Sequence, residues 1–281
     1  MARAQQSHGK KCGLTEGAGG ERDVGRVWLR VLLALGCAWP GVAPAADRRC
    51  PMRTVAEDGA ALAVAPLHWG EWQWLKLAAG LGAVGMAALF DDEVQDRWGE
   101  GDDGLADVGD AYAFVGPAMA LLYYGARGAG RDPAASRTAW GLGESALFTF
   151  VASGVAKVVV GRERPDVDGD NHGFHPFSRD DDYHAFPSFH TGLAFSTAAV
   201  LQDSDLPVPL KGAAYGLAGL TAWSRLRDDR HWFSDAVAGG ILGYTIGRWT
   251  VHHRHGKGTT TSHLVPEVAA GRVGMAWQHA F

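Results

Sequence analysis

Cysteine is scarce in this chain of 281 residues, which contains only Cys12, Cys37 and Cys50 and has no C-x-x-C pair. The sequence therefore indicates neither a zinc site nor a disulfide framework. Basic residues are not in excess either, because 26 Lys and Arg stand against 31 Asp and Glu, which gives a formal net charge of −5. This balance gives no indication of a nucleic-acid partner.

Long hydrophobic runs are also missing. The longest stretches in the apolar part of the chain that contain neither a charged residue nor a histidine are residues 77–90 and 111–126. Both are shorter than the roughly 20 apolar residues that a membrane-spanning helix needs. We therefore expect a soluble, exported helical protein, with an integral membrane protein as the alternative.

Six apolar segments rich in alanine and glycine predict helices, and no alternating segment of any length separates them. The sequence therefore predicts an all-α fold with a six-helix core bundle. The expected helices are His68–Phe90 and residues 105–125, 134–160, 188–203, 208–224 and 232–252. Only the C-terminal segment Leu264–Phe281 has a strand-like composition.

The N-terminal part of the chain is typical of an exported protein. Arg26 and Arg30 precede the short apolar run Val31–Trp39 and a small-residue exit, the pattern of a secretory signal peptide. We expect a periplasmic or envelope-associated location. The predicted organisation is a disordered extension (1–23), a signal peptide (24–46), a linker (47–65), a helical domain (66–255) and a tail of uncertain structure (256–281).

Two clusters in the second half place cations and a histidine at helix ends. Lys157 and Arg164 lie seven residues apart, about two helical turns, so both can project the same way before Pro165 stops the helix. Ser188 and His190 follow at the start of another helix, whose free N–H groups form a natural phosphate cradle. A basic helix end and a capped helix start are the simpler interpretations of these clusters.

A third cluster places His231 four residues before Asp235, on one face of a helix. A carboxylate in that position can hold one imidazole nitrogen as N–H and leave the other as nucleophile or base. Arg225, Arg227 and Arg230 nearby favour an anionic substrate, since a planar guanidinium suits phosphate oxygens. A solvated charge cluster at a helix start is the alternative.

Taken together, the patterns K-x6-R-P, P-S-x-H and S-R-x5-H-x3-D across residues 157–235 resemble the three-part signature of the type-2 phosphatidic acid phosphatase and vanadium haloperoxidase superfamily. The resemblance implies the six-helix bundle of that superfamily. It also implies an exported, metal-independent phosphatase that hydrolyses phosphate monoesters or lipid phosphates through a phosphohistidine. Phosphorylated lipids or small phosphate esters would be its partners, with association at a membrane surface. The physiological substrate and the oligomeric state stay open.

The resemblance also implies roles for individual residues. His231 would attack phosphorus, Asp235 would fix its tautomer, and His190 would protonate the leaving oxygen. The phosphoryl oxygens would be held by Lys157, Arg164, Ser188, Phe189 and Arg225. The superfamily usually has glycine where this chain has Phe189, whose N–H remains usable if its side chain points away.

Two other functions remain as alternatives. One is a vanadate-dependent haloperoxidase, in which vanadate would bind as a phosphate analogue. The other is a non-catalytic envelope protein that retains the motif. Neither a metal nor another cofactor is expected for the phosphatase, although Asp180–Asp182 between His175 and His184 form either a metal patch or, more simply, a solvated acidic loop.

Overall fold

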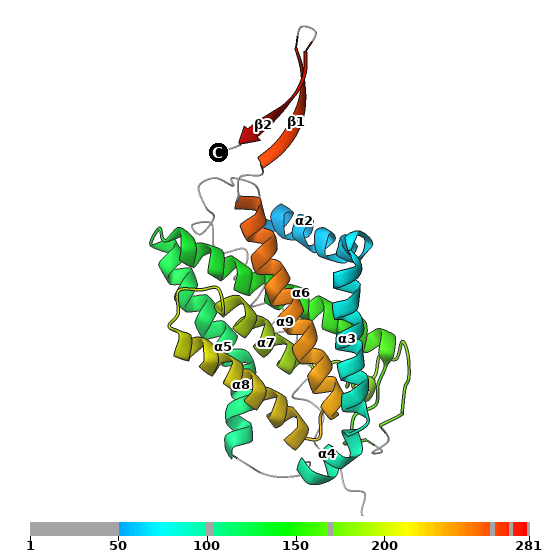
Figure 1. Ribbon diagram of the computed structural model, residues 1–281. Helices are drawn as coiled ribbons and strands as arrows, with labels where there is room; N and C mark the ends of the chain where they lie inside the picture. Colours follow the sequence, from blue (N-terminus) through cyan, green and yellow to red (C-terminus); the bar gives the residue numbers. More distant parts are fainter. Residues whose placement is uncertain (1–50, 99–103, 168–170, 259–261, 270–271, 280–281) are drawn as a thin grey trace, which may run out of the picture. The chain divides into compact units, whose positions relative to one another are not determined.

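The computed structural model describes residues 51–98, 104–167, 171–258, 262–269 and 272–279. The predicted extension and signal peptide lie outside the described residues. The helices are α2 (Pro51–Val64), α3 (Glu71–Ala88), α4 (Asp91–Trp98), α5 (Gly104–Ala129), α6 (Pro133–Val160), α7 (Phe189–Leu201), α8 (Val208–Arg227) and α9 (Phe233–Gly258) (Figure 1). Two short 3-10 turns, η1 (Ala65–His68) and η2 (Asp181–Tyr183), complete the helical part of the description.

The all-α prediction is confirmed for the domain that carries the motifs. Each segment predicted to be helical overlaps with one of the helices α3, α5, α6, α7, α8 and α9. Alanine and glycine dominate their contacts, because small side chains let helix backbones approach closely. A Cβ on Gly243 of α9, for example, would lie 1.9 Å from the carbonyl oxygen of Gly192 of α7.

The predicted linker is instead helical, because α2 begins at Pro51 and runs to Val64. Tertiary contacts hold this helix in place. Asp58 is almost fully buried, with Oδ1 at 3.3 Å from Nε2 of His253 on α9, and Gly59 packs against the ring of Phe148 on α6. A weakly apolar segment of this kind carries little sign of such contacts in its own sequence.

The acidic residues after Phe90, where the sequence predicted the end of a helix, begin the further helix α4. This helix is bent by 55° from α3. Asp91 at its first position is almost fully buried and accepts a hydrogen bond from the backbone N–H of Ser234. The buried carboxylate thus ties α4 to the start of α9.

The C-terminal segment with strand-like composition forms an antiparallel hairpin. β1 (Ser262–Ala269) pairs with β2 (Arg272–His279), with Ser262 opposite His279 and Ala269 opposite Arg272. The hairpin is separate from the helical domain in sequence and takes no part in the site described below.

Helix α7 lies at the centre of the helical domain. Ten of its 13 residues are buried, and it contacts α5, α6, α8 and α9. Its side chains Ala198, Val200 and Leu201 share one core cluster with Tyr124 of α5 and Leu142 of α6. The first turn of this central helix carries His190, which is therefore held by helices on several sides.

Candidate active site

Four chain segments that carry the sequence motifs come together at one end of the helical domain. They are the C-terminal ends of α6 and α8 and the N-terminal ends of α7 and α9. The end of α8 and the start of α9 lie beside α4, at the lower end of the domain in Figure 1. Residues that are up to 78 positions apart in the sequence, from Lys157 to Asp235, thereby share one site.

Gly161 ends α6 and turns the chain into the site. It adopts a left-handed conformation with φ of +60°, and its N–H donates to the carbonyl of Lys157. A side chain is excluded there, since a Cβ would lie 1.9 Å from the carbonyl oxygen of His175. The insert that follows folds back along this turn, where Arg164 donates its backbone N–H to the carbonyl of Asp182 at 3.0 Å.

Three cations from different elements enclose the site, and each has an acceptor in the structure. Lys157 Nζ donates to the carbonyl of His184. Arg164 Nη2 lies 2.8 Å from Asp181 Oδ2, and Arg225 Nη1 lies 2.5 Å from Asp110 Oδ1. Asp181 and Asp110 are partly exposed, so these ion pairs lie at the edge of the site rather than deep within it.

The acidic insert therefore has a specific partner. Asp181 pairs with Arg164, and its other oxygen lies 3.8 Å from Nδ1 of His184. Among the residues that the structure describes, no three His, Cys, Asp or Glu side chains gather in a way that could hold a metal ion. The insert is thus a set of carboxylates at the edge of the cationic site.

The start of α7 offers hydrogen-bond donors. Ser188 is fully buried, and its oxygen accepts a hydrogen bond from Thr191 Oγ1 at 3.0 Å, which leaves its own hydroxyl proton to be donated elsewhere. The ring of Phe189 packs against the rings of Phe150 and Phe114, with centroids 5.6 Å and 6.4 Å away. The first N–H groups of a helix have no intrahelical acceptor, so the α7 start can bind an anion.

His231 is buried, and the orientation of its ring is set mainly by a backbone carbonyl. Its Nδ1 lies 2.7 Å from the carbonyl oxygen of Ala185 but 3.9 Å from Asp235 Oδ2. A carbonyl can only accept, so Nδ1 carries the proton and Nε2 keeps its lone pair. The sequence assigned this tautomer to Asp235 alone, whereas the shorter of the two contacts is made by Ala185.

Both histidines face the same positive charges. Burial lowers the pKa of His190 well below its usual value, and the charges of Arg225, His231, Lys157 and Arg164 lower it further. The pKa of His231 is lowered in the same way, first by burial and then by Lys157, Arg225 and Arg164. The two imidazoles and three cations therefore converge, as the motifs predicted, and the free site favours neutral imidazoles.

Asp235 is fully buried behind His231. Burial raises the pKa of its carboxyl group, while the positive charge of Arg162 opposes that rise. Its Oδ2 accepts a hydrogen bond from the backbone N–H of Trp232 at 2.9 Å. The carboxylate is thus bound to the loop that carries His231.

Two of the three arginines near the last motif, Arg227 and Arg230, make contacts outside the candidate site. Arg227 donates to the carbonyl of Trp98 at 3.1 Å, and Arg230 lies 3.3 Å from Asp166. Sequence reasoning left out Arg162, which contacts Asp235, and the carbonyl of Ala185, which contacts His231. It also left out Asp91, which contacts Arg162. The only feature of the sequence that pointed to Arg162 was its position inside the first motif. No feature of the sequence pointed to Asp91.

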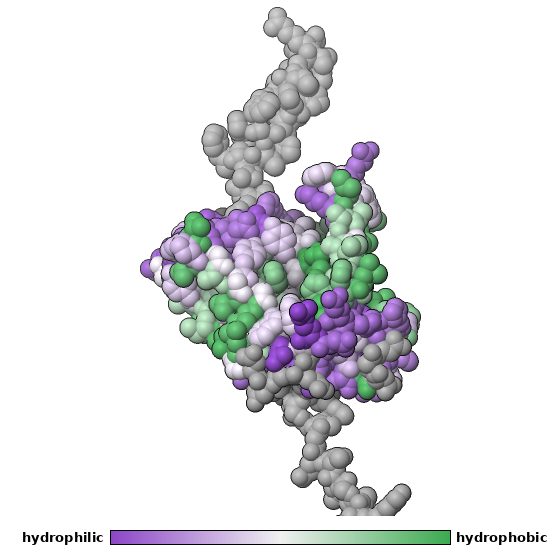
Figure 2. Space-filling model, turned by 60° about the horizontal axis from the view of Figure 1, so that its bottom comes forward, coloured by the Kyte–Doolittle hydropathy of each residue, from purple (hydrophilic) through white to green (hydrophobic). Residues whose placement is uncertain are grey.

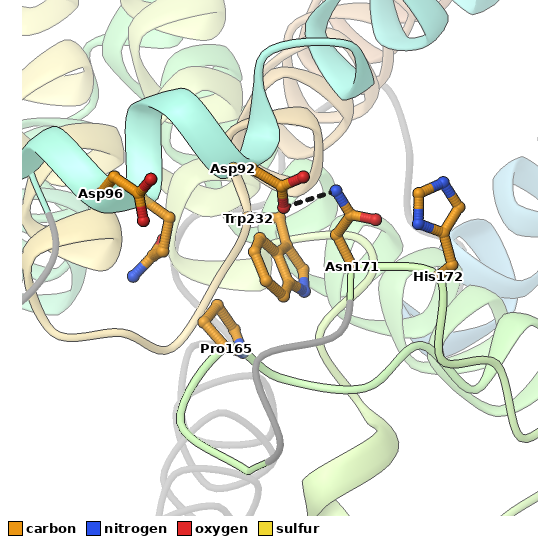
Figure 3. A pocket seen from close by; sticks show the side chains of 7 residues that line it. Asp92, Asp96, Pro165, Asn171, His172 and Trp232 are labelled. Carbon is orange, nitrogen blue, oxygen red and sulfur yellow. Dashed lines mark hydrogen bonds between the residues drawn. The ribbon is translucent and has the colours of Figure 1, made fainter.

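A cavity of about 410 Å³ borders the site and is shown in Figure 3. Pro165 and Trp232 belong to its lining, and each directly follows a candidate residue in the sequence. The dashed line in Figure 3 marks the hydrogen bond from Asn171 Nδ2 to Asp92 Oδ1, 2.7 Å long. The lining residues are Asp92, Gln95, Asp96, Pro165, Asn171, His172 and Trp232.

Comparison with protein families gave one match. Residues 138–258 match the model of the PAP2 superfamily, a region that contains all three motifs and runs from α6 to the end of α9. No curated protein and no solved structure matched the chain.

Proposed function

We propose that this protein hydrolyses phosphate monoesters, and lipid phosphates in particular, through a phosphohistidine. The match of residues 138–258 to the model of the PAP2 superfamily supports this proposal. The observation that carries the proposal is the convergence of His190 and His231 with three cations at one end of the bundle. Cations around two neutral imidazoles suit a phosphoryl group that is transferred to nitrogen. The wider arrangement of helices is proposed to be the six-helix bundle of the acid phosphatase and haloperoxidase type.

In the proposed reaction, Nε2 of His231 attacks phosphorus and the P–O bond to the leaving alcohol breaks. His190 donates a proton to the leaving oxygen, so the alcohol departs neutral. The now neutral His190 then takes a proton from water, whose oxygen attacks the phosphohistidine and releases inorganic phosphate. Burial and then the surrounding cations hold the pKa of His190 low in the free site. A bound phosphate dianion offsets the cations and so favours the protonated acid in the complex.

The oxygens of the phosphoryl group would be held by groups on four segments. Arg225 contributes from α8, and the Ser188 hydroxyl and the Phe189 N–H contribute from the start of α7. Lys157 and Arg164 contribute from the end of α6 and the turn that follows. Donors fixed in this way stabilise charge as it develops without having to reorganise.

Aromatic side chains beside the proposed acid favour an apolar leaving group. The ring of Phe114 lies edge-on to His190 with centroids 4.9 Å apart, and Phe189 lies between Phe114 and the half-exposed Phe150. A leaving alcohol protonated by His190 would therefore contact apolar rings. The alkyl part of a lipid alcohol suits such a surface better than a sugar does.

The proposal predicts phosphate release by the purified chain in excess EDTA. We expect phosphatidate in mixed micelles to be hydrolysed with a higher kcat/KM than a sugar phosphate such as glucose 6-phosphate, because only the lipid carries alkyl chains that can contact the phenylalanines. Bromide oxidation after addition of vanadate and hydrogen peroxide, without phosphate release, would favour the haloperoxidase alternative. Loss of both activities in a folded protein would favour the non-catalytic one.

The helical domain also exposes large apolar side chains in unusual number. Helices α5 and α6 are long and apolar enough to cross a membrane, and α3 with α4 would form a third, bent span. In the most apolar 18-residue stretch of each helix, only 17% of the residues of α5 and 28% of those of α6 are buried. Figure 2 shows hydrophobic areas in green on the sides of the domain. The exposed set on α3, α5 and α6 includes Trp72, Leu75, Leu81, Met86, Val115, Met119, Leu122, Val151 and Val155.

We propose that this apolar surface lies in a lipid bilayer. The charge-free runs of the sequence argued against a span. However, α5 and α6 have 26 and 28 residues, and their charged residues lie towards the helix ends apart from Glu144, which is buried. Export, predicted from residues 24–46, stays a prediction. After expression, we expect the chain to remain in the membrane pellet through an alkaline carbonate wash and to dissolve in detergent. Release into the carbonate supernatant would contradict this.

A further inference from the structure

Arg162 is a buried cation without a role in the reaction described above. Its side chain is 5% exposed and donates four hydrogen bonds. Nη1 donates to Asp235 Oδ1 at 2.8 Å and to Ser234 Oγ at 2.6 Å. Nη2 donates to Asp91 Oδ2 at 2.8 Å and to the carbonyl of Asn171 at 2.9 Å. The guanidinium thus joins α4, the insert and the start of α9.

The backbone of Arg162 is also connected to His231, through hydrogen bonds made by Ala185. Its carbonyl accepts a hydrogen bond from the N–H of Ala185 at 3.0 Å. The carbonyl of Ala185 in turn accepts from Nδ1 of His231 at 2.7 Å. Side chain and main chain of one residue therefore hold the two groups, Asp235 and Ala185, that face Nδ1 of His231.

Asp91 anchors this arrangement from α4. Besides accepting from Arg162, it accepts from the backbone N–H of Ser234 and from the Ser234 hydroxyl, each at 2.7 Å. Asp91 and Asp235 are both essentially inaccessible to solvent. A buried cation between two buried carboxylates is strongly oriented, because any movement would leave one carboxylate uncompensated.

We propose that Arg162 is a positioning residue, which holds Asp235 ionised and in place behind His231 and is itself fixed by Asp91. This inference rests on the proposed phosphatase function. Phosphorylation of Nε2 makes His231 cationic, and the nearby carboxylate of Asp235 stabilises that charge only while it is ionised.

The charges around Asp235 explain why an arginine is needed. Burial raises the pKa of this carboxyl group, and the opposing influences are Arg162, the Trp232 N–H and, more weakly, Lys157. His231 lies 3.9 Å away on the other side, and Asp91 faces Arg162 from α4. Without the arginine, burial would dominate and Asp235 would take up a proton at a higher pH.

Arg162→Met tests this inference through the pH profile of kcat/KM for phosphate release. We expect a loss of about 100-fold at neutral pH, as for a modest misplacement of a reacting group. The acid side of the pH profile should also move to higher pH by about one to three units, because removal of an adjacent opposite charge usually raises the pKa of a carboxyl group by that amount. Arg162→Lys keeps the charge and should return this side of the profile close to the wild-type position.

Arg248→Met is the matched control. Arg248 lies on the part of α9 that is far from His231, and its Nη1 is paired with Asp203 Oδ1 at 3.0 Å. Its profile should coincide with that of the wild type. If Arg162→Met loses activity evenly at all pH values, or matches the control, the positioning role is wrong. The phosphatase function would still stand if the wild-type protein releases phosphate.

A second comparison uses a double variant and adds a spectroscopic readout that does not depend on turnover. If Arg162 acts through Asp235, Arg162→Met combined with Asp235→Asn should lose no more activity than Asp235→Asn alone. Infrared spectra at neutral pH should show the C=O stretch of a protonated carboxyl in Arg162→Met that is absent from the wild type and from the double variant. Absence of that band in a folded Arg162→Met protein overturns the proposal even if no substrate is hydrolysed.

Discussion

Replacement of His231 by alanine is expected to abolish phosphate release, with a fall in kcat of about 10⁴-fold or more. The imidazole is buried, its Nδ1 proton is held by Ala185, and only Nε2 is left for attack on phosphorus. The three cations remain in the variant, so KM should change far less than kcat. The measurement is phosphate release from the preferred substrate across a range of concentrations.

His252→Ala is the control for this variant, because His252 lies on α9, the helix that follows His231, and is exposed. It should keep the wild-type kcat. Rapid alkaline quenching with ³²P-labelled substrate should trap a labelled protein in the wild type and in His252→Ala but not in His231→Ala. A labelled His231→Ala protein, or one that turns over at the wild-type rate, would refute the phosphohistidine at this position.

Replacement of Arg225 by methionine is expected to lower kcat/KM by about 10²- to 10³-fold, which corresponds to about 3–4 kcal/mol of transition-state stabilisation. The guanidinium is buried at the end of α8, where its charge acts on both histidines. Its partners Asp110 and Asp228 have side chains that are 47% and 38% exposed. Solvent can therefore compensate them, and the fold should survive the substitution.

Arg227→Met makes the same chemical change two residues further along the chain. Arg227 donates to the carbonyl of Trp98 and lies outside the candidate site, so kcat/KM should stay within about threefold of the wild type. Inhibition by added vanadate, which imitates the transferred phosphoryl group, should weaken in Arg225→Met and persist in Arg227→Met. Equal losses in both variants would show that Arg225 contributes only general positive charge.

Much of the helical architecture could be predicted from local sequence. Apolar segments bounded by proline, glycine or acidic residues predict helices because those boundary residues cannot continue a helix or favour its ends. Gly161 and Pro165 illustrate this at the end of α6. The helix α2 escaped prediction because its stability comes from the packing of Asp58 and Gly59 against distant helices.

The sequence favoured a soluble protein, whereas the exposed apolar side chains led us to propose a membrane protein, and the reason for this difference is related. A count of uncharged residues cannot tell whether a polar residue inside a helix faces lipid or protein. Glu144 in the middle of α6 is buried, whereas Val151 and Val155 of the same helix are exposed. Only the packed structure separates these faces and shows that apolar side chains are on the outside.

The amino-acid sequence alone was enough to predict the identities and spacing of the proposed reacting groups. Their patterns depend only on position along the chain and comprise Lys157, Arg164, Ser188, His190, Arg225, His231 and Asp235. The tertiary structure decided which groups hold them. Arg162, Asp91 and the carbonyl of Ala185 come from segments as far as 144 positions from Asp235, and no periodicity in the sequence links them. Hydrogen bonds and charges act through space, so the supporting contacts of His231 became visible only when α4, α6, the insert and α9 were brought together.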